Sequence, residues 1–304
     1  MSAWLPTVDV VIATHHRPEL LRTAIDAVLQ QTYAGDITCV VVFDQSEPDH
    51  TLEVLDPHRR VVVTTNTRSP GLAGARNSGI GASDHELVAF CDDDDVWLPD
   101  KLARQVVELA KDGAATCVTG IIVEYGDHRQ ARVPTPVEMS LQVLVRNRTM
   151  AGHPSTVVVR REALVGPIGL VDENIPGSYG EDFDWILRAA ETGPIAVVEA
   201  PLVVVRWGQS LFSRNWQTII DSIDYGFTKH PQFTADPKAR ARLLGRKGFA
   251  QAALGQRRAA LGTALAAATS SASERRAYLT VAVALRLVTA ERLLSIAHKR
   301  GHGI

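Results

Sequence analysis

Cysteine is scarce in this chain of 304 residues, and long uncharged apolar runs are absent. The three cysteines stand far apart at Cys39, Cys91 and Cys117, and none belongs to a CxxC pair. They predict buried, reduced thiols and argue against a disulfide framework or a zinc site. No run reaches the roughly 18 apolar residues of a membrane-spanning helix. The first residues lack the basic start of a signal peptide, so we expect a cytoplasmic protein.

Several catalytic signatures are also missing. The sequence contains no GK[ST], no GxGxxG, no GxSxG and no HExxH. These absences argue against a Walker phosphate loop, a Rossmann fingerprint, an α/β-hydrolase nucleophile and a zinc protease. Hydrolase interpretations therefore have little support.

Charge is distributed unevenly along a chain of otherwise ordinary composition. The apolar fraction of 45% and charged fraction of 22% exclude a disordered or collagen-like chain. The net charge of −2 hides a split, because residues 238–304 sum to +11 and residues 1–237 to −13. We therefore expect two functional parts, and the basic part could face an anionic membrane or a nucleic acid.

The first two thirds of the chain alternate between strand-like and helix-like patterns. Buried strands are expected at the β-branched runs 8–14, 38–43, 60–65, 86–91, 115–123, 156–160 and 195–205. Helices are expected from Pro18 and over 102–110 and 183–190. This alternation predicts an α/β fold whose mostly parallel sheet has helices on both faces, with ligands at the carboxyl ends of the strands.

The C-terminal part shows no strand pattern. From Asp236 the composition becomes rich in Ala, Leu and Arg, which predicts helices. A break at TSSASE separates two of them, and Ser273 could cap the second.

Four consecutive acids, Asp92–Asp95, follow the expected strand 86–91 directly in VAFCDDDDVWLPD. Adjacent carboxylates repel one another and need a cation or good solvation to stay ionised. Carboxylates at a strand end suit a hard divalent ion that also holds a phosphate. A solvated acidic turn before a helix is the alternative.

Other polar residues also follow expected strands or glycine-rich segments. Asp44 in VVVFDQS could accept from a base or a ribose hydroxyl, or could form an Asx turn. Arg76, in GLAGARNSGIG, is a candidate partner for a diphosphate or base. Glu181 and Asp182, in GSYGEDFDW, could supply a general base or an N-cap, and both roles are compatible.

Taken in order, these motifs resemble family 2 glycosyltransferases with the GT-A fold over about residues 1–213. The opening VDVVIATHHRPELL, the aspartate motif VVVFDQS and the loop GLAGARNSGIG all match in order. The strongest matches are the D-x-D-D motif in CDDDDVW and the E-D motif in GEDFDW. The resemblance implies a GT-A catalytic domain over 1–213 and a basic helical region over 214–304.

The resemblance also implies site roles. It divides the catalytic domain into a nucleotide-sugar half, about 1–123, and an acceptor half, about 124–213. Residues carried over to the nucleotide-sugar site are Thr14, His15, Arg17, Asp44, Arg76, Asp92 and Asp93. A divalent metal, Mn²⁺ or Mg²⁺, would be held by Asp94 with Asp92. Asp182 would be the general base, and Glu181 would position the acceptor or Asp182.

Some positions depart from the family pattern. Histidines 15 and 16 stand where an aromatic residue and an asparagine are common. Phe43 replaces the first of two acids in the second-strand motif, and Gly208 lies near the place of a frequent metal-binding histidine. No QxxRW motif of the processive polymerases occurs. The resemblance therefore implies inverting transfer of one or a few sugars, with the identity of the last metal ligand open.

The expected partners follow from this interpretation. The donor would be a nucleotide-diphosphate sugar, with UDP favoured and dTDP or GDP as alternatives. The acceptor would be a glycan, a lipid-linked sugar or a small molecule. The tail would pack on the protein or a second copy, or rest on the anionic inner face of the plasma membrane. Nucleic acid is not expected, because the tail offers few aromatic residues for base stacking. A sugar-nucleotide nucleotidyltransferase and a non-catalytic nucleotide-sugar-binding module are the alternative functions.

Overall fold

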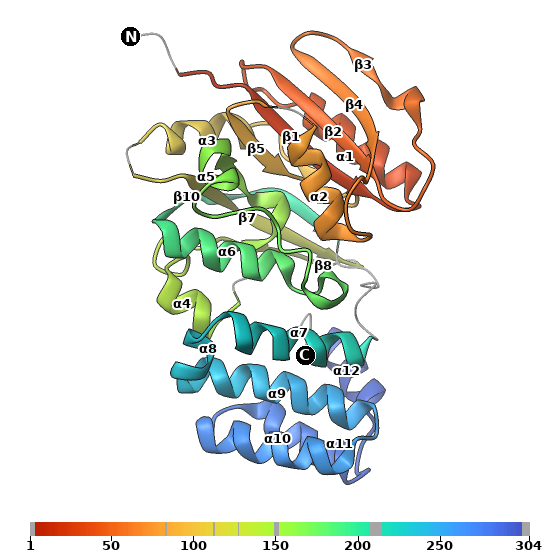
Figure 1. Cartoon of the computed structure of the whole chain (residues 1–304), viewed down its shortest axis with the longest axis vertical. Coiled ribbons are helices and arrows are strands. Elements are labelled where there is room, and N and C mark those ends of the chain that lie inside the picture. Colours follow the sequence, from red (N-terminus) through yellow and green to blue (C-terminus); the bar gives the residue numbers. More distant parts are fainter. Residues whose placement is uncertain are drawn as a thin grey trace. The chain divides into compact units, whose positions relative to one another are not determined.

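The computed structural model describes residues 4–82, 84–111, 113–126, 128–148, 152–206 and 215–299. Contacts divide the chain into two compact units (Figure 1). We call the first the sheet unit; it comprises Met1–Leu144, Arg148–Asn174 and Glu181–Gly208. The second, the helical unit, comprises Val145–Asn147, Ile175–Gly180 and Gln209–Ile304. The predicted boundary at 213 falls outside the described residues.

The sheet unit is built on a mixed sheet in the order β3-β4-β2-β1-β5-β9-β7-β10-β6, with β8 paired to β7. Its parallel half is formed by β4 (Arg59–Thr65), β2 (Ile37–Phe43), β1 (Val8–Thr14) and β5 (Leu87–Phe90). Strands β2, β1 and β5 are short, apolar and almost wholly buried, as strands covered on both faces should be, whereas β4 is partly exposed. The predicted mostly parallel sheet is confirmed.

The other half of the sheet mixes strand directions. Strands β7 (Thr116–Tyr125) and β10 (Ile195–Arg206) are parallel to each other. Strand β9 (Val158–Arg160) is inserted antiparallel between β5 and β7. The remaining antiparallel strands are β3 (Val54–Leu55), β6 (Val96–Trp97) and β8 (His128–Arg132).

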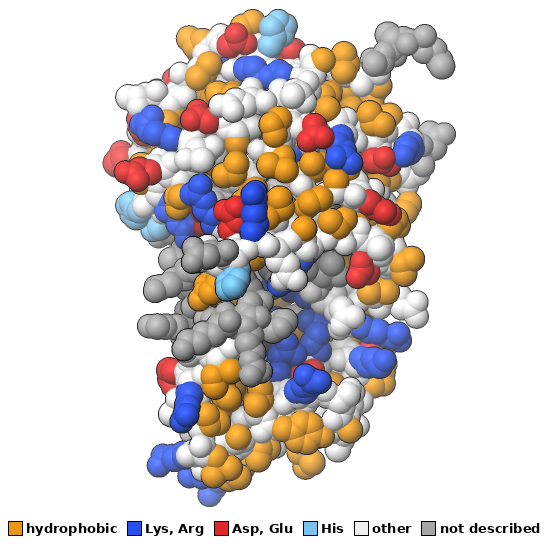
Figure 2. All heavy atoms as spheres, turned by 180° about the vertical axis from the view of Figure 1, so that it is seen from behind, with side chains coloured by type: hydrophobic (Ala, Val, Ile, Leu, Met, Phe, Trp, Pro, Cys, Tyr) orange, Lys and Arg blue, Asp and Glu red, His pale blue; other side chains and the backbone are white. Residues whose placement is uncertain are grey.

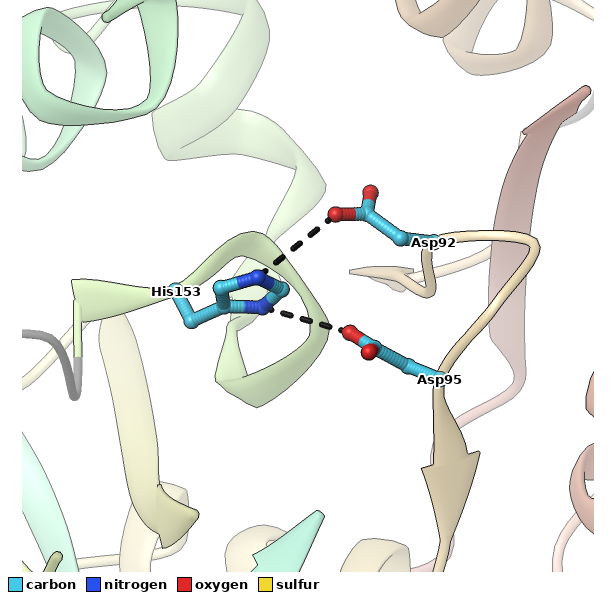
Figure 3. A group of neighbouring side chains, drawn as sticks. All are labelled: Asp92, Asp95 and His153. Atoms are coloured by element: carbon cyan, nitrogen blue, oxygen red, sulfur yellow. Dashed lines mark ion pairs between the residues drawn. The ribbon is translucent and has the colours of Figure 1, made fainter. Parts of the chain in front are cut away.

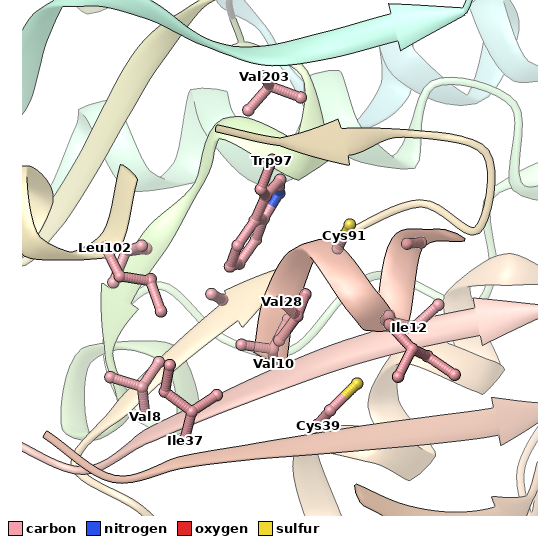
Figure 4. Close-up of a cluster of buried hydrophobic side chains, with 14 of the residues drawn as sticks. Val8, Val10, Ile12, Val28, Ile37, Cys39, Cys91, Trp97, Leu102 and Val203 are labelled. Atoms are coloured by element: carbon pink, nitrogen blue, oxygen red, sulfur yellow. The ribbon is translucent and has the colours of Figure 1, made fainter. Parts of the chain in front are cut away.

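Helices cover both faces of the sheet. Helices α1 (Pro18–Leu29) and α3 (Lys101–Leu109) pack over Val10, Ile12 and their neighbours, which form the main hydrophobic core (Figure 4). Helix α2 (Leu72–Gly81) lies on the opposite face. A side chain at Gly79 would come within 2.4 Å of Val11, so this close approach requires glycine.

Short elements complete the sheet unit and its connections. The sheet unit contains η1 (His50–Leu52), η3 (Pro154–Thr156), α5 (Arg161–Val165) and α6 (Glu181–Thr192). Helix α4 (Leu141–Arg146) begins in the sheet unit and ends in the helical unit, and η4 (Pro176–Ser178) belongs to the helical unit. The expected start of α1 at Pro18 is confirmed, because proline occupies its first turn. All three cysteines are buried and unpaired, and burial raises the pKa of Cys39 and of Cys117 to about 12.

The helical unit contains α7 (Trp216–Lys229), α8 (Gln232–Ala235), α9 (Pro237–Ala253), α10 (Arg257–Ser270), α11 (Arg275–Ala284) and α12 (Ala290–Lys299). Helix α9 packs against α10 and α11 (Figure 1), around a core that contains Phe249 and Ala260. Helix α7 lies within the helical region expected over 214–304, although it begins before Asp236, where the composition first indicated helices. The expected cap Ser273 was wrong, because Glu274 accepts the bond from the Arg276 amide. Among the described helices, none combines the length and apolar character needed to cross a membrane.

Candidate active site

The polar residues singled out in the sequence follow three adjacent parallel strands. Strand β1 ends at Thr14, β2 ends at Phe43 before Asp44, and β5 ends two residues before Asp92. Because β2, β1 and β5 are neighbours in register, their carboxyl ends meet at one edge of the sheet. The edge therefore collects side chains from segments far apart in the sequence.

Asp93 and Asp94 are held by residues that follow β1. The Thr14 hydroxyl donates to Asp93 over 2.8 Å. The Arg17 guanidinium contacts Asp93 at 3.1 Å and Asp94 at 2.7 Å. Burial raises the pKa of both carboxyls, and their charge outweighs burial to raise the pKa of Arg17. Thr14 and Arg17 thus lie against the acid cluster, where the sequence placed the edge of the nucleotide pocket.

A histidine from a distant loop lies between the first and last acids of the cluster (Figure 3). His153 precedes η3, and its Nδ1 lies 3.3 Å from Asp95 Oδ2. Its Nε2 lies 3.7 Å from Asp92 Oδ2. Ser155 fixes the turn, since its hydroxyl donates to Asp95 over 2.5 Å and accepts from the Asp92 amide over 2.9 Å. Burial raises the pKa of Asp95 to about 7.

Arg76 connects the D-x-D-D motif to the E-D motif. Its guanidinium donates to Asp92 Oδ1 over 2.6 Å and also pairs with Glu181, which lies 105 residues away. Arg76 is 3% exposed and stacks over Phe90. Burial would lower its pKa, but Asp92 and Glu181 outweigh burial and raise it. The structure therefore places Arg76 between two acids of the site.

The E-D motif begins helix α6. Burial raises the pKa of Glu181 to about 7. The next residue, Asp182, accepts from Arg148 over 2.5 Å. Burial would also raise the pKa of Asp182, but Arg148 and Arg76 outweigh it and hold this pKa below its ordinary value. Asp182 is therefore ionised at neutral pH.

Acidic side chains outnumber basic ones at this edge of the sheet. The carboxylates are Asp92, Asp93, Asp94, Asp95, Glu181 and Asp182. Among the described residues, three guanidiniums form ion pairs with them: Arg17, Arg76 and Arg148. The formal balance is −3. Carboxylate oxygens and an imidazole nitrogen are donors that Mn²⁺ and Mg²⁺ accept, so the residues present fit a divalent cation.

One group of ligand-type side chains is especially close. Single ligand atoms of Asp92, Asp95 and His153 all lie within 4.8 Å of one another. Asp92 belongs to the metal pair expected from the sequence, whereas Asp94 pairs with Arg17. Gly208, near which a further ligand was sought, lies outside the described residues.

Asp44 and a loop form a second part of the site. Asp44 accepts from the Asn66 side chain over 2.7 Å and from the Gly71 amide over 3.0 Å. Gly71 precedes α2 with a φ of +108°, a conformation that requires glycine. The carbonyl oxygen of Asp44 lies 2.8 Å from His15 Nδ1, and the ring of His15 contacts that of His16.

Glu173 holds the same loop from another segment. It accepts from the Ser69 hydroxyl over 2.6 Å, from Asn77 over 2.7 Å and from Arg68. Burial would raise its pKa, but bonds from Ser69, Asn77 and Arg68 lower it to about 2. The loop 66–71 is therefore fastened between two carboxylates, those of Asp44 and Glu173.

Sequence reasoning missed Arg148, His153, Ser155 and Glu173. His153 is one of ten histidines, and no spacing motif distinguishes it from the others. The position of His153 at the start of HPST, just before a buried strand, was the available signal. Strand β9 runs antiparallel to β5 and so begins beside the acids that follow β5.

Comparisons with known proteins define the class. Residues 9–165 match the model of glycosyl transferase family 2. The chain therefore belongs to the family 2 glycosyltransferases and is an enzyme of glycosyl transfer. The nucleotidyltransferase and non-catalytic alternatives are set aside.

Particular relatives agree with this assignment. A UDP-Glc:alpha-D-GlcNAc-diphosphoundecaprenol beta-1,3-glucosyltransferase, WfgD of Escherichia coli, is 23% identical over 68% of this chain and 80% of its own. Among solved structures, residues 1–349 of S. aureus TarS with UDP-GlcNAc have a TM-score of 0.62 at 15% identity, with coverage of 97% of this chain and 92% of that segment. The mannosyltransferase PcManGT of Pyrobaculum calidifontis, with GDP-Man and Mn²⁺, has a TM-score of 0.57 at 20% identity and covers 95% and 83%. These structures share the GT-A fold.

Proposed function

We propose that the enzyme transfers a sugar from a nucleotide-diphosphate donor to an acceptor hydroxyl with inversion at the anomeric carbon. One observation carries this proposal: Arg76 joins Asp92 of the D-x-D-D motif to Glu181 of the E-D motif. The acids that would face a leaving diphosphate and those that would face an acceptor thus belong to one charge network.

Asp182 is the general base in this proposal. Its pKa is held below the ordinary value, so it is ionised at neutral pH. As the acceptor oxygen attacks the anomeric carbon, its proton passes to the Asp182 carboxylate. The bond to the diphosphate oxygen breaks, and its electron pair leaves with the nucleoside diphosphate. Arg148 orients Asp182 through their 2.5 Å contact, and Glu181 anchors the start of α6 to Arg76.

A divalent cation would be held by Asp92 and Asp94. Bound there, it would act as a Lewis acid that stabilises the charge on the departing diphosphate. The formal excess of three negative charges supports this assignment, because a dication would offset most of it. PcManGT was solved with Mn²⁺, so we propose Mn²⁺ or Mg²⁺ for this enzyme.

The nucleotide would lie over the ends of β1 and β2. Asp44 keeps free acceptor capacity, because each carboxylate oxygen can accept two bonds, and Oδ1 accepts one described bond from Asn66. We assign it to an N–H group of the base, with Thr14, His15, Arg17 and Asp93 at the edge of the site. TarS binds UDP-GlcNAc and PcManGT binds GDP-Man, so we propose UDP first, then dTDP or GDP.

We propose that the acceptor is lipid-linked. We also propose that the helical unit contacts an anionic membrane. WfgD is named for a diphosphoundecaprenol acceptor. Residues 238–304 carry a charge of +11, and Leu285 and Leu287 are 47% and 77% exposed on either side of Arg286. Figure 2 shows basic side chains among apolar ones over the helical unit. Such a surface supports reversible, salt-sensitive membrane contact.

The catalytic proposal is tested by a donor screen. UDP-, dTDP- and GDP-sugars are incubated with the full-length enzyme, Mn²⁺ or Mg²⁺, and simple or lipid-linked acceptors. We expect nucleoside diphosphate release with one nucleotide and, by NMR of the product, an inverted anomeric centre. Retention of configuration would contradict Asp182 as base, and equal rates in EDTA would contradict the metal.

The membrane proposal is tested separately by co-sedimentation with vesicles. We expect pelleting with vesicles that contain phosphatidylglycerol at low salt, and loss of pelleting at high salt. Leu287→Ser should weaken it, and Val107→Ser, an exposed residue of the sheet unit, is the matched control. Equal, negligible pelleting with anionic and neutral vesicles would overturn the membrane contact without affecting the catalytic proposal.

A further inference from the structure

We propose that His153 is a direct ligand of the divalent cation and that Asp95 orients it. The inference rests on the proposed metal-dependent function, and it adds a ligand that no motif of the sequence identified. It assigns Asp95 to holding the imidazole, and adds His153 to the proposed ligands Asp92 and Asp94.

The first step is the distance between the two ligand atoms. His153 Nε2 lies 3.7 Å from Asp92 Oδ2. Ligand atoms of Mg²⁺ or of a comparable cation lie about 2.1 Å from it, so two of them are at most about 4.2 Å apart. The observed separation is too long for a hydrogen bond and falls within this span. One cation can therefore contact both atoms.

The second step concerns which carboxylate oxygen of Asp92 is free of an ion pair with Arg76. Asp92 Oδ1 accepts from Arg76 over 2.6 Å, which leaves Oδ2 as the oxygen that faces His153. The Asp92 amide donates to Ser155, so the backbone at this ligand is fixed as well. Arg76 and Ser155 together hold Asp92 so that one oxygen remains directed at the imidazole.

The third step concerns the orientation of the ring. Nδ1 lies 3.3 Å from Asp95 Oδ2, and Asp95 is 1% exposed and held by Ser155 over 2.5 Å. A ring whose Nδ1–H faces a fixed carboxylate presents the lone pair of Nε2 on its other side (Figure 3). This carboxylate–histidine arrangement commonly orients metal-binding imidazoles and selects their tautomer. The buried Asp95 fits this supporting position.

A structural role for His153 is the competing explanation. Nδ1 also lies 3.4 Å from the Ser155 amide, as in a cap of η3. The two contacts at Nδ1 require opposite tautomers, because a nitrogen that accepts from the Ser155 amide cannot donate to Asp95. In the capping tautomer Nε2 would carry the proton, and at 3.7 Å from Asp92 Oδ2 it lies too far away to donate it. The competing role does identify the best test variant. Asparagine is a good helix cap, so His153→Asn can keep the cap while removing the imidazole.

The experiment uses the full-length protein with Mn²⁺ alone and with Mn²⁺ and UDP. Pulsed electron paramagnetic resonance should show the modulation of a directly bound imidazole nitrogen in the wild type. His153→Asn should lose this modulation and bind Mn²⁺ at least tenfold more weakly by calorimetry, with its thermal midpoint nearly unchanged. His153→Gly should regain the modulation when free imidazole is added, which a purely structural residue would not allow.

Two further variants complete the design. Asp95→Asn should keep a nitrogen ligand but weaken Mn²⁺ binding about tenfold, the usual scale for loss of a supporting partner. His85→Asn, at the other end of strand β5, is the matched control and should change neither the spectrum nor the affinity.

The outcomes separate this inference from the proposed function. Mn²⁺ binding that depends on Asp92 or Asp94, with no nitrogen modulation in the wild type, would overturn the role of His153 and leave the metal-dependent function standing. Modulation that persists in His153→Asn would likewise overturn it. Absence of Mn²⁺ binding with and without UDP would overturn both.

Discussion

Two clusters of aspartate, histidine and arginine lie at opposite ends of strand β5. Beside its first residues, Asp9 contacts His85 at 2.9 Å and Arg161 at 2.6 Å. Beyond its last residues, Asp92 and Asp95 flank His153, and Asp92 pairs with Arg76. The residue types are the same, but we assign chemistry to only one of the two clusters.

The difference between the clusters is charge balance. Asp9 is fully buried and faces one guanidinium and one imidazole, so its charge is matched within the protein. At the other end, six carboxylates share three guanidiniums. A balanced cluster holds elements together, whereas an acid-rich one keeps capacity for a cation or a proton. Residue identity alone does not distinguish the two.

The antiparallel pairing of β5 and β9 produces both clusters. Leu87 lies opposite Arg160, and Ala89 lies opposite Val158. The chain therefore enters β9 beside the acids that follow β5, and leaves it beside His85, which precedes β5. One pair of short strands supplies a histidine or arginine to each end.

The largest expected effect is on catalysis at the acid-rich end. Asp182→Asn removes the proposed base but keeps the shape of the side chain. We expect kcat to fall by about 10²- to 10⁴-fold, the usual scale for general base loss, while donor affinity stays within a few-fold. Steady-state kinetics and calorimetry with the nucleoside diphosphate measure the two quantities. Near-normal turnover would leave Asp182 as an acidic residue of the first turn of α6, with no part in the chemical step.

The next effect is on stability at the balanced end. Asp9→Ala would leave Arg161, whose side chain is 16% exposed, without its carboxylate, and breaking a largely buried pair costs about 3 kcal/mol. We expect the free energy of unfolding in urea to fall by about that amount, with kcat of the folded enzyme within twofold of wild type. A selective loss of kcat, or a loss of stability below about 1 kcal/mol, would show that the two clusters do not differ as proposed.

Much of the fold follows from local sequence patterns. Runs of β-branched residues predicted the buried parallel strands, and Pro18 predicted the start of α1. Both predictions succeeded because periodicity and helix starts are local properties of the sequence. The prediction failed where local signals conflict, since Glu274, and not Ser273, caps α11. It was coarse at α7, which lies in the expected helical region but begins before the Ala-rich composition that was used as the helical signal.

The site was predictable as a set of motifs but not as a set of contacts. The motifs placed Asp92 and Asp182 in one site. They could not show that Arg76 bridges Asp92 and Glu181 across 105 positions, or that Arg148 faces Asp182. Such pairs depend on which loops the sheet order brings together. The contacts of His153 could not be predicted for the same reason, because its partners Asp92 and Asp95 follow β5, whereas His153 precedes β9.

A smaller effect is expected at Glu173. This carboxylate belongs to the site, but its charge is satisfied by hydrogen bonds from neighbouring donors within the protein. Glu173→Gln would weaken its bonds to Ser69, Asn77 and Arg68, and so loosen the loop that contacts Asp44. We expect about a tenfold rise in KM for the donor with kcat within twofold, because the loop positions the proposed base-binding residue. Asp172→Asn is the neighbouring control. A fall in kcat at unchanged KM would place Glu173 in the chemical step instead.

The smallest expected effect is on the pH dependence of stability at His85. Its contact with Asp9 outweighs burial and raises the pKa of His85 above the ordinary value of 6.5. The folded state therefore binds a proton more tightly than the unfolded state. The resulting stabilisation is fully present below about pH 6.5 and is lost as pH rises through the folded-state pKa. Because the side chain is 25% exposed, solvent screening should keep this term below about 1 kcal/mol.

His85→Asn removes the titrating ring and tests this expectation. Urea unfolding of wild type and variant at pH values from 5.5 to about 8.5 gives the difference in free energy of unfolding at each pH. Other titrating groups are shared by the two proteins and cancel in this difference. We expect the advantage of the wild type to shrink with rising pH, while kcat stays the same in both proteins. An advantage that grows with pH would mean that the ring is bound as the neutral form, and that the charge of Asp9 is met by Arg161 without the imidazole.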